Sequence, residues 1–218
     1  DYLATEFVDS GWSFRHLHRL MVTSETYRLT SSNGGAAPST LAADPTNQFY
    51  WRMNARRMES QVVRDSLLQL AGKLDPRLGG PSIDPKKGGP RRSLYFTHSP
   101  EKLDLFLTMF DEADLQQCYR RSESVVPQQA LALANSELAF AMAASISENL
   151  GSSGERDDFI EAAFETVLAR RPDASELAEC RSFFDEWAEL NSDSRDESRV
   201  RRQLVHALLN HNDFVTIR

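Results

Sequence analysis

The stretch from Phe110 to Ser136, FDEADLQQCYRRSESVVPQQALALANS, decides how the rest of the chain is interpreted. It holds clustered carboxylates, a cysteine, an arginine pair and a proline followed by the longest helical pattern of apolar residues. Proline suits the first turn of a helix, because its φ is fixed near the helical value and its missing N–H would have no partner there. The pattern therefore predicts a helix from Pro127 to about Leu150, with the other helices and loops packed before and after this stretch.

Outward from this stretch, the periodicity is that of a mainly α-helical, multi-helix protein. Further helices are expected over residues 1–10, 13–22, 56–74 and 101–110, and three more between residues 158 and 215. Their apolar residues, such as Leu3 and Val8 or Phe14 and Met21, are expected to face inward. Residues 30–48 and 76–91 are rich in Gly, Pro and Ser and predict two long ordered loops. SLYFT at 93–97 is the best strand candidate, so at most one or two short strands are expected.

The segment GSSG at 151–154 predicts a joint between two parts of the chain. Residues 1–150 would form a domain with a helical core and both long loops. Residues 155–218 would form an antiparallel subdomain of three helices joined by short connections. Within it, Asp173 followed by Glu176 predicts a capping box.

Composition limits the classes of function. The 218 residues carry a net charge of −7, which argues against broad nucleic-acid binding because that needs a basic surface. No apolar run has the length of a membrane span. Two cysteines, Cys118 and Cys180, do not make a disulfide scaffold, and the sequence leaves open whether they are free. The helical pattern already present at Asp1 suggests a chain cut from a longer protein, with any export signal upstream.

No complete catalytic motif occurs in the sequence. It has no GxGxxG, P-loop, HExxH, GxSxG or CxxCH haem-attachment segment. The glycine pairs at 79–80 and 88–89 do not open a helix after a strand, so we interpret them as loop turns.

The acidic part of the central stretch offers the first candidate site. Asp111, Asp114 and Cys118 are spaced so that a helix would place them on one face, which suits metal ligands, and the two aspartates are weak candidates for that role. Alternatively, an aspartate caps a turn and Cys118 is a small buried apolar residue. Arg121 and its neighbour could instead lower the pKa of Cys118 and make it nucleophilic, provided that a base comes from elsewhere.

His98 is the histidine of most interest, because it follows the strand candidate in a loop, where functional groups collect. A structural hydrogen bond is its simpler role. His16 and His18 are two residues apart and would point to different faces of a helix, which argues against a site made by this pair. The candidate catalytic residues are therefore Asp111, Asp114, Cys118, Arg121 and His98.

Arginines gather before and within the predicted helix at 56–74. Arg52, Arg56, Arg57 and Arg64 lie near Glu59 and Asp65, and Arg91 and Arg92 precede the strand candidate. They could bind an anionic partner, such as a charged sugar. The intermingled carboxylates favour a salt-bridged helix face instead.

These motifs resemble one family. The central stretch looks like the planctomycete surface domain that follows cytochrome c-like domains in large exported proteins, a domain of unknown function. The matching residues are Phe110, Asp111, Asp114, Cys118, Arg121, Ser124, Pro127, Gln129, Ala130, Leu131 and Asn135. Further segments also resemble the family: 11–20, 22–24, 26–28, 44–45, 51–53, 56–59, 64–65, 79–81, 92–93 and 204–214. His211 and Gln128 are small departures.

The resemblance implies a periplasmic or cell-surface protein whose upstream domains could carry haem c, while this chain itself holds no cofactor. It implies partners among the other domains of the same polypeptide, or a protein or anionic carbohydrate partner. The family has no assigned reaction, so no residue inherits a catalytic role. We therefore expect a non-catalytic accessory or interaction domain, with a hydrolase or redox enzyme around the five candidate residues as the alternative.

Overall fold

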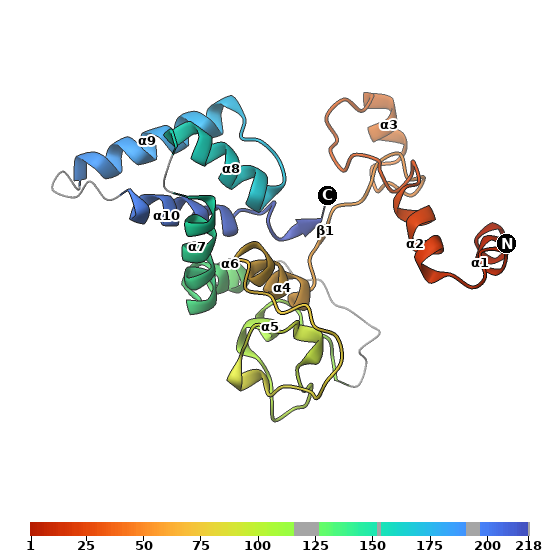
Figure 1. Cartoon of the computed structure of the whole chain (residues 1–218). Helices are drawn as coiled ribbons and strands as arrows, with labels where there is room; N and C mark the ends of the chain where they lie inside the picture. Colours follow the sequence, from red (N-terminus) through yellow and green to blue (C-terminus); the bar gives the residue numbers. More distant parts are fainter. Residues whose placement is uncertain (116–126, 152–153, 191–196, 218) are drawn as a thin grey trace. The chain divides into compact units, whose positions relative to one another are not determined.

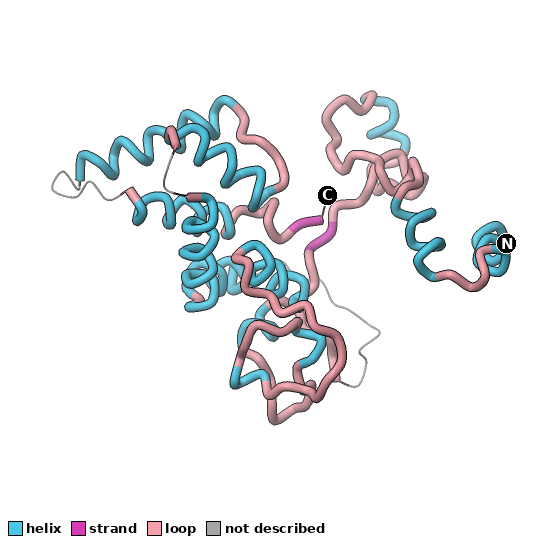
Figure 2. The backbone as a smooth tube through the Cα atoms, viewed as in Figure 1, coloured by secondary structure: helices cyan, strands magenta, loops and turns pink. Residues whose placement is uncertain are grey.

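The computed structural model of the chain describes residues 1–115, 127–151, 154–190 and 197–217. Within these ranges it is mainly helical, with ten α-helices and a single small sheet of two strands, as the sequence predicts (Figures 1 and 2). The strands are β1 (Arg56–Arg57) and β2 (Thr216–Ile217). The chain divides into unit 1, residues 1–56 with the residues from 216 on, and unit 2, residues 57–215. The predicted division near residue 151 into a domain and a subdomain stays a prediction.

Unit 1 holds three short helices, α1 (Tyr2–Asp9), α2 (Phe14–Val22) and α3 (Pro38–Ala43). Ser13 caps α2 as predicted, since its hydroxyl accepts a hydrogen bond from the His16 amide at 3.2 Å. The prediction of inward apolar faces is wrong for α1 and α2, because none of their residues is buried. A pair of helices this short has no second layer of structure that could cover both apolar faces.

The loop that follows α3 is ordered by polar groups. The carboxylate of Asp44 accepts hydrogen bonds from the amides of Gln48 and Phe49, both at 2.8 Å. The indole N–H of Trp51 donates to the Asp44 carbonyl at 2.9 Å. Asn47 is buried and donates to the Arg52 carbonyl at 2.7 Å. The predicted long loop at 30–48 therefore contains a helix and a hydrogen-bonded turn.

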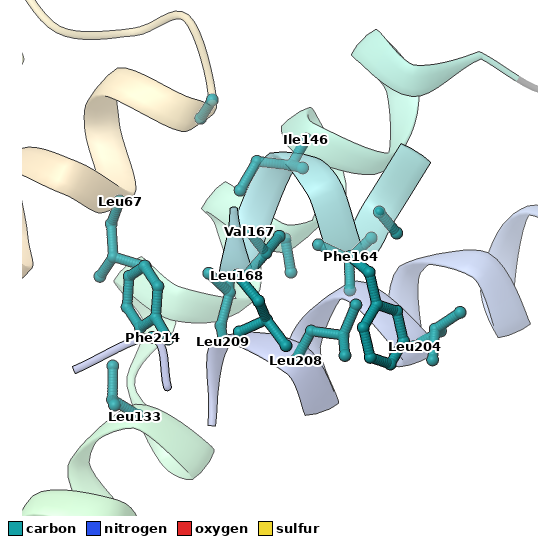
Figure 3. Packing of buried hydrophobic residues seen from close by; sticks show 14 of the residues in the cluster. Leu67, Leu133, Ile146, Phe164, Val167, Leu168, Leu204, Leu208, Leu209 and Phe214 are labelled. Carbon is teal, nitrogen blue, oxygen red and sulfur yellow. The ribbon is translucent and has the colours of Figure 1, made fainter. Parts of the chain in front are cut away.

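Unit 2 contains the hydrophobic core. Its helices are α4 (Ser60–Leu70), α5 (Leu105–Met109), α6 (Pro127–Asn135), α7 (Glu137–Leu150), α8 (Arg156–Leu168), α9 (Ala174–Leu190) and α10 (Ser198–Leu209). Residues from α4, α6, α7, α8, α9 and α10 and from the tail meet in one cluster, part of which Figure 3 shows. The labelled members are Leu67, Leu133, Ile146, Phe164, Val167, Leu168, Leu204, Leu208, Leu209 and Phe214. The three helices predicted after residue 158 are α8, α9 and α10, which pack against one another.

The long helix predicted from Pro127 to Leu150 is in fact two helices. Pro127 begins α6 as expected, but the chain bends by 57° between α6 and α7. The Ser136 hydroxyl accepts a hydrogen bond from the Ala139 amide at 2.9 Å and so caps a new helix. In the described part of the chain, no single helix is long and apolar enough to cross a membrane, although α6 and α7 taken together would pass on length and composition.

The strand predicted at 93–97 is wrong. Residues Ser93–Tyr95 form a 3₁₀ turn, and only an isolated bridge joins Phe96 to Ile83. The reason is the carboxylate of Asp65 in α4, which accepts hydrogen bonds from the Ser93 amide at 2.8 Å and its hydroxyl at 2.6 Å. The helix predicted over 56–74 is shorter, because Arg56 and Arg57 pair with β2 and α4 begins only at Ser60.

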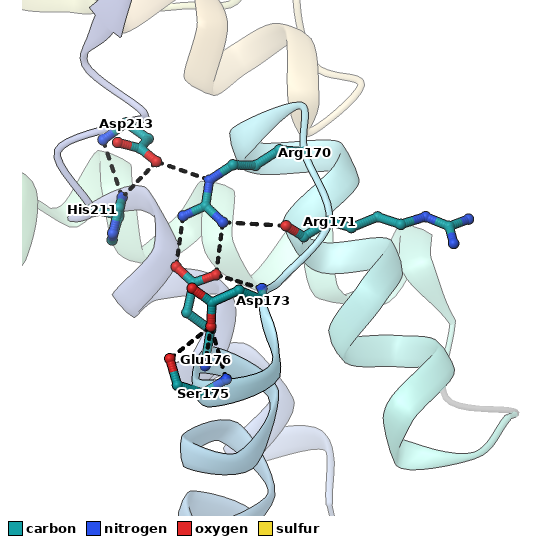
Figure 4. A network of polar contacts seen from close by, with 7 residues as sticks. All are labelled: Arg170, Arg171, Asp173, Ser175, Glu176, His211 and Asp213. Carbon is teal, nitrogen blue, oxygen red and sulfur yellow. Dashed lines mark hydrogen bonds and ion pairs between the residues drawn. The ribbon is translucent and has the colours of Figure 1, made fainter. Parts of the chain in front are cut away.

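A polar network joins the end of α8, the start of α9 and the tail (Figure 4). The Arg170 guanidinium donates two hydrogen bonds to the Glu176 carboxylate, at 2.7 and 2.6 Å, and one to Asp213 at 2.9 Å. Asp173 and Glu176 form the predicted capping box, since each carboxylate accepts a hydrogen bond from the other residue's amide at 2.8 Å. The network fixes the turn at Pro172 and holds the tail against it.

Candidate functional site

His98 lies beside the acidic stretch, but not beside the carboxylates that the sequence singled out. Its Nδ1 lies 3.3 Å from Oε1 of Glu112, whose side chain is largely buried. Glu112 lies between Asp111 and Asp114 in the FDEAD segment. The sequence did not indicate it, because helical spacing groups the two aspartates and leaves Glu112 out, whereas residues 112–114 are not helical. The loop that carries His98 therefore does reach the central stretch.

Asp111 has a structural role. It adopts a left-handed backbone conformation with φ of 56°, and its carboxylate accepts a hydrogen bond from the Gln129 amide group at 3.1 Å. Gln129, in α6, is 2% exposed and accepts a hydrogen bond from Arg57 at 3.0 Å. Arg57 also donates to Asn212 at 3.0 Å. A chain of polar contacts thus connects the acidic turn, α6, β1 and the tail, and fixes where α6 starts.

The other candidates are only partly described. Asp114 is exposed, three residues after Asp111, and takes part in an interaction of its own. Cys118 and Arg121 lie outside the described residues, so the structure does not place them. Among the residues that are described, no three His, Cys, Asp or Glu side chains gather as metal ligands.

The His98–Glu112 pair is the arrangement here that could support acid–base chemistry. A carboxylate beside one imidazole nitrogen orients the ring and leaves the other nitrogen free to exchange a proton with a substrate. With Nδ1 facing Glu112, that nitrogen is Nε2, on a side chain that is 33% exposed. The pair by itself supplies a base and no nucleophile.

The arginines of α4 and the following loop are used within the fold. Arg64 is 4% exposed and donates to the carbonyls of Gly89 at 2.6 Å and Arg91 at 3.0 Å. Burial lowers the pKa of Arg64, and the nearby carboxylates of Asp65 and Asp104 oppose that shift. Arg64 also lies 3.5 Å from the Asp65 carboxylate, so it forms a salt bridge as the alternative predicts, but a buried one that ties Gly89 and Arg91 to α4.

Cys180 is a free thiol on the core side of α9. Burial, followed by the charges of Glu176 and Glu179, raises the pKa of Cys180 to about 11. The thiolate is the nucleophilic form, and it is scarce at neutral pH when the pKa is this high. Cys180 is therefore a packing residue, as its position in the apolar pattern predicts.

Comparison with known proteins places the chain in a family. The model of the PSD1 family, described as a protein of unknown function (DUF1553), matches residues 1–184. The match includes all of residues 1–56, the central stretch and the helices up to the middle of α9. No curated protein and no solved structure matches the chain. Because the family model covers well over half of its length, the chain belongs to the PSD1 family of proteins of unknown function.

Proposed function

We propose that this chain is a non-catalytic interaction domain of a larger exported protein, and that α1 and α2 dock on other domains of the same polypeptide. The observation that carries the proposal is the uncovered apolar surface of unit 1. Trp12 is 67% exposed and Phe14 66% exposed, although both are large aromatic residues. Large exposed apolar clusters of this kind mark interaction surfaces.

The exposed aromatic residues lie together in one cluster and are not scattered singly over the surface. The Phe7 ring lies 5.3 Å from the Trp12 ring and 4.8 Å from the Phe14 ring, measured between centroids. Leu3 and Val8 of α1 are also exposed. Burial of such side chains is worth about 1.5–3 kcal/mol each, so a partner that covered them would be bound through the hydrophobic effect.

The resemblance described above supports the choice of partner. It implies an exported polypeptide at the periplasm or cell surface, with cytochrome c-like domains upstream that could hold haem c. In such a protein the surface of α1 and α2 has a permanent neighbour at high effective concentration, so a modest interface is enough to keep it covered.

Hydrogen exchange tests the proposal. In the full-length polypeptide, the amides of α1 and α2 are expected to exchange at least about tenfold more slowly than in the 218-residue chain, because docking opposes local opening. Phe14→Asp should restore fast exchange. Phe49→Asp is the matched control, since Phe49 is 82% exposed in the loop of the same unit. Equal exchange rates in the two proteins would overturn the proposal.

The His98–Glu112 contact favours one second candidate, a hydrolase or redox enzyme with its site around the acidic stretch. For a hydrolase, the 218-residue chain would cleave a simple ester or phosphate ester, and His98→Gln would abolish the cleavage. His16→Gln is the control, because the His16 ring is exposed and contacts Glu6 in unit 1, at 3.1 Å. Activity that survives His98→Gln would exclude His98 as the base.

A further inference from the structure

Unit 2 contains a cavity of about 660 Å³ that neither the candidate site nor the proposed docking surface uses. Four elements line it. They are the 3₁₀ turn, through Pro85 and Lys86 with Gly88 and Gly89 after it, residues 103–106 at the start of α5, Arg64 of α4 and Leu138 of α7. Its volume falls within the range of about 300–1,000 Å³ that small-molecule sites occupy.

The wall formed by the glycine loop is held in place. Arg64 lines the cavity and donates to the Gly89 carbonyl at 2.6 Å and to the Ser93 hydroxyl at 3.2 Å. The turn itself is capped by Asp84, whose carboxylate accepts a hydrogen bond from the Lys86 amide at 3.1 Å. Asp104 caps α5 on the other wall through the Leu107 amide at 3.0 Å. The cavity is therefore built by fixed backbone rather than by a chance gap between side chains.

The lining is mainly apolar. Five of the lining residues are Pro85, Leu103, Leu105, Phe106 and Leu138. Leu105 is 76% exposed at the first position of α5. Exposure of an apolar side chain to water is unfavourable, so a ligand that covered Leu105 would be favoured. Apolar surface around a cavity of this size suits the body of a small apolar ligand.

The charge of the lining suits an anion. Its charged residues are Arg64, Lys86 and Asp104, which gives one net positive charge in a chain whose net charge is −7. The charge of Arg64 is already opposed by Asp65 and Asp104. Among the described residues, the ammonium of Lys86 makes no ion pair. The nearby carboxylate of Asp84 interacts with Lys86 through charge but forms its ion pair with Lys102, at 3.3 Å, so Lys86 is the lining cation that can face a ligand.

We propose that this cavity binds a small, mainly apolar monocarboxylate, such as an aromatic or branched aliphatic acid. The apolar body lies against Leu103, Leu105 and Leu138, and the carboxylate faces the ammonium of Lys86. The proposal goes beyond the docking of unit 1, because it concerns only residues of unit 2 and holds whether or not α1 and α2 have a partner.

The test uses 3-phenylpropanoate and its uncharged analogue 3-phenylpropanamide, titrated into the 218-residue chain and followed by ligand-observed NMR. A ligand of this size is expected to bind with a Kd of about 1 mM. The acid should bind about three- to fivefold more tightly than the amide, as expected for one partly exposed charge pair. Lys86→Gln should remove that preference. Lys87→Gln is the matched control, because Lys87 adjoins Lys86 but does not line the cavity.

A second variant separates this cavity from other apolar surfaces. Leu105→Asp places a carboxylate at the rim and should abolish binding of the acid, while the fold tolerates an acidic residue in the first turn of a helix. Leu131→Asp is its control, since Leu131 is 57% exposed on α6 and does not line the cavity. Any of four outcomes would overturn the proposal. The acid and the amide could bind with equal affinity, or Lys86→Gln could keep the preference for the acid. Binding of the acid could survive Leu105→Asp, or neither ligand could bind at all.

Discussion

Replacing Phe184 with alanine is expected to lower the free energy of unfolding of unit 2 by about 3–5 kcal/mol, the largest effect of any single substitution considered for this protein. The Phe184 side chain is 1% exposed in α9, and its ring lies beneath the Arg156 guanidinium at 5.7 Å and near the Phe183 ring at 6.3 Å. Truncation removes the buried ring and leaves a cavity between α9 and the core. Urea unfolding followed by circular dichroism measures the change.

Leu190→Ala provides the control for this prediction. Leu190 ends the same helix and is 84% exposed, so its truncation should change the free energy of unfolding by less than about 0.5 kcal/mol. A loss below about 1 kcal/mol for Phe184→Ala would show that α9 is not packed on the core as described.

Arg170→Met is expected to lower the free energy of unfolding by about 2 kcal/mol at pH 7. This figure allows for solvent screening of the ion pairs, because about a third of the Arg170 side chain is exposed. The substitution removes the hydrogen bonds that Arg170 donates to Glu176 and Asp213. The Asp213 side chain is only 7% exposed and would lose its closest charged partner. Arg171→Met is the control, because Arg171 is 73% exposed and pairs with surface glutamates. Equal losses from the two substitutions would contradict the prediction.

The same substitution should weaken the dependence of stability on pH. Hydrogen bonds from Arg170 lower the pKa of Glu176 below its ordinary value of 4.5 in the folded chain. The folded state therefore favours the ionised carboxylate, and this stabilisation is present above about pH 4.5 and is lost as the pH falls through the lowered pKa. Between pH 6 and pH 3 the parent chain should lose more stability than Arg170→Met does. Parallel losses would show that Arg170 does not set this pKa.

Local signals in the sequence predicted much of unit 2. Pro127 begins α6, and Asp173 with Glu176 caps α9, because caps and proline act within a few residues of the chain. The bend at Ser136 was missed although serine is a common N-cap, since the apolar pattern continues across it and hides the break. The periodicity of apolar residues indicates which residues can be buried, but it does not indicate where one helix ends and the next begins.

The strand prediction at 93–97 failed for a different reason. Its residues have the right local preference, but Asp65, 28 positions earlier, binds Ser93 and turns the backbone. The candidate site shows the same limit, because His98 meets Glu112 through a loop whose course no local pattern specifies. In unit 1 the periodicity correctly predicted α1 and α2, yet their apolar faces stay exposed. An amphipathic pattern predicts that one face of a helix favours burial, but it does not identify the surface that buries it.

The hydrogen bond from the Met58 amide to the Val215 carbonyl, 2.8 Å long, brings together the two ends of unit 2. The chain leaves unit 1 at Arg56 and re-enters it at Thr216, where β2 pairs with β1. Topologically, unit 2 is thus an insertion within unit 1, entered and left at neighbouring points. Because its ends adjoin, a short connection could join them into a circular permutant, or unit 2 could be exchanged for another domain without stretching the flanking chain.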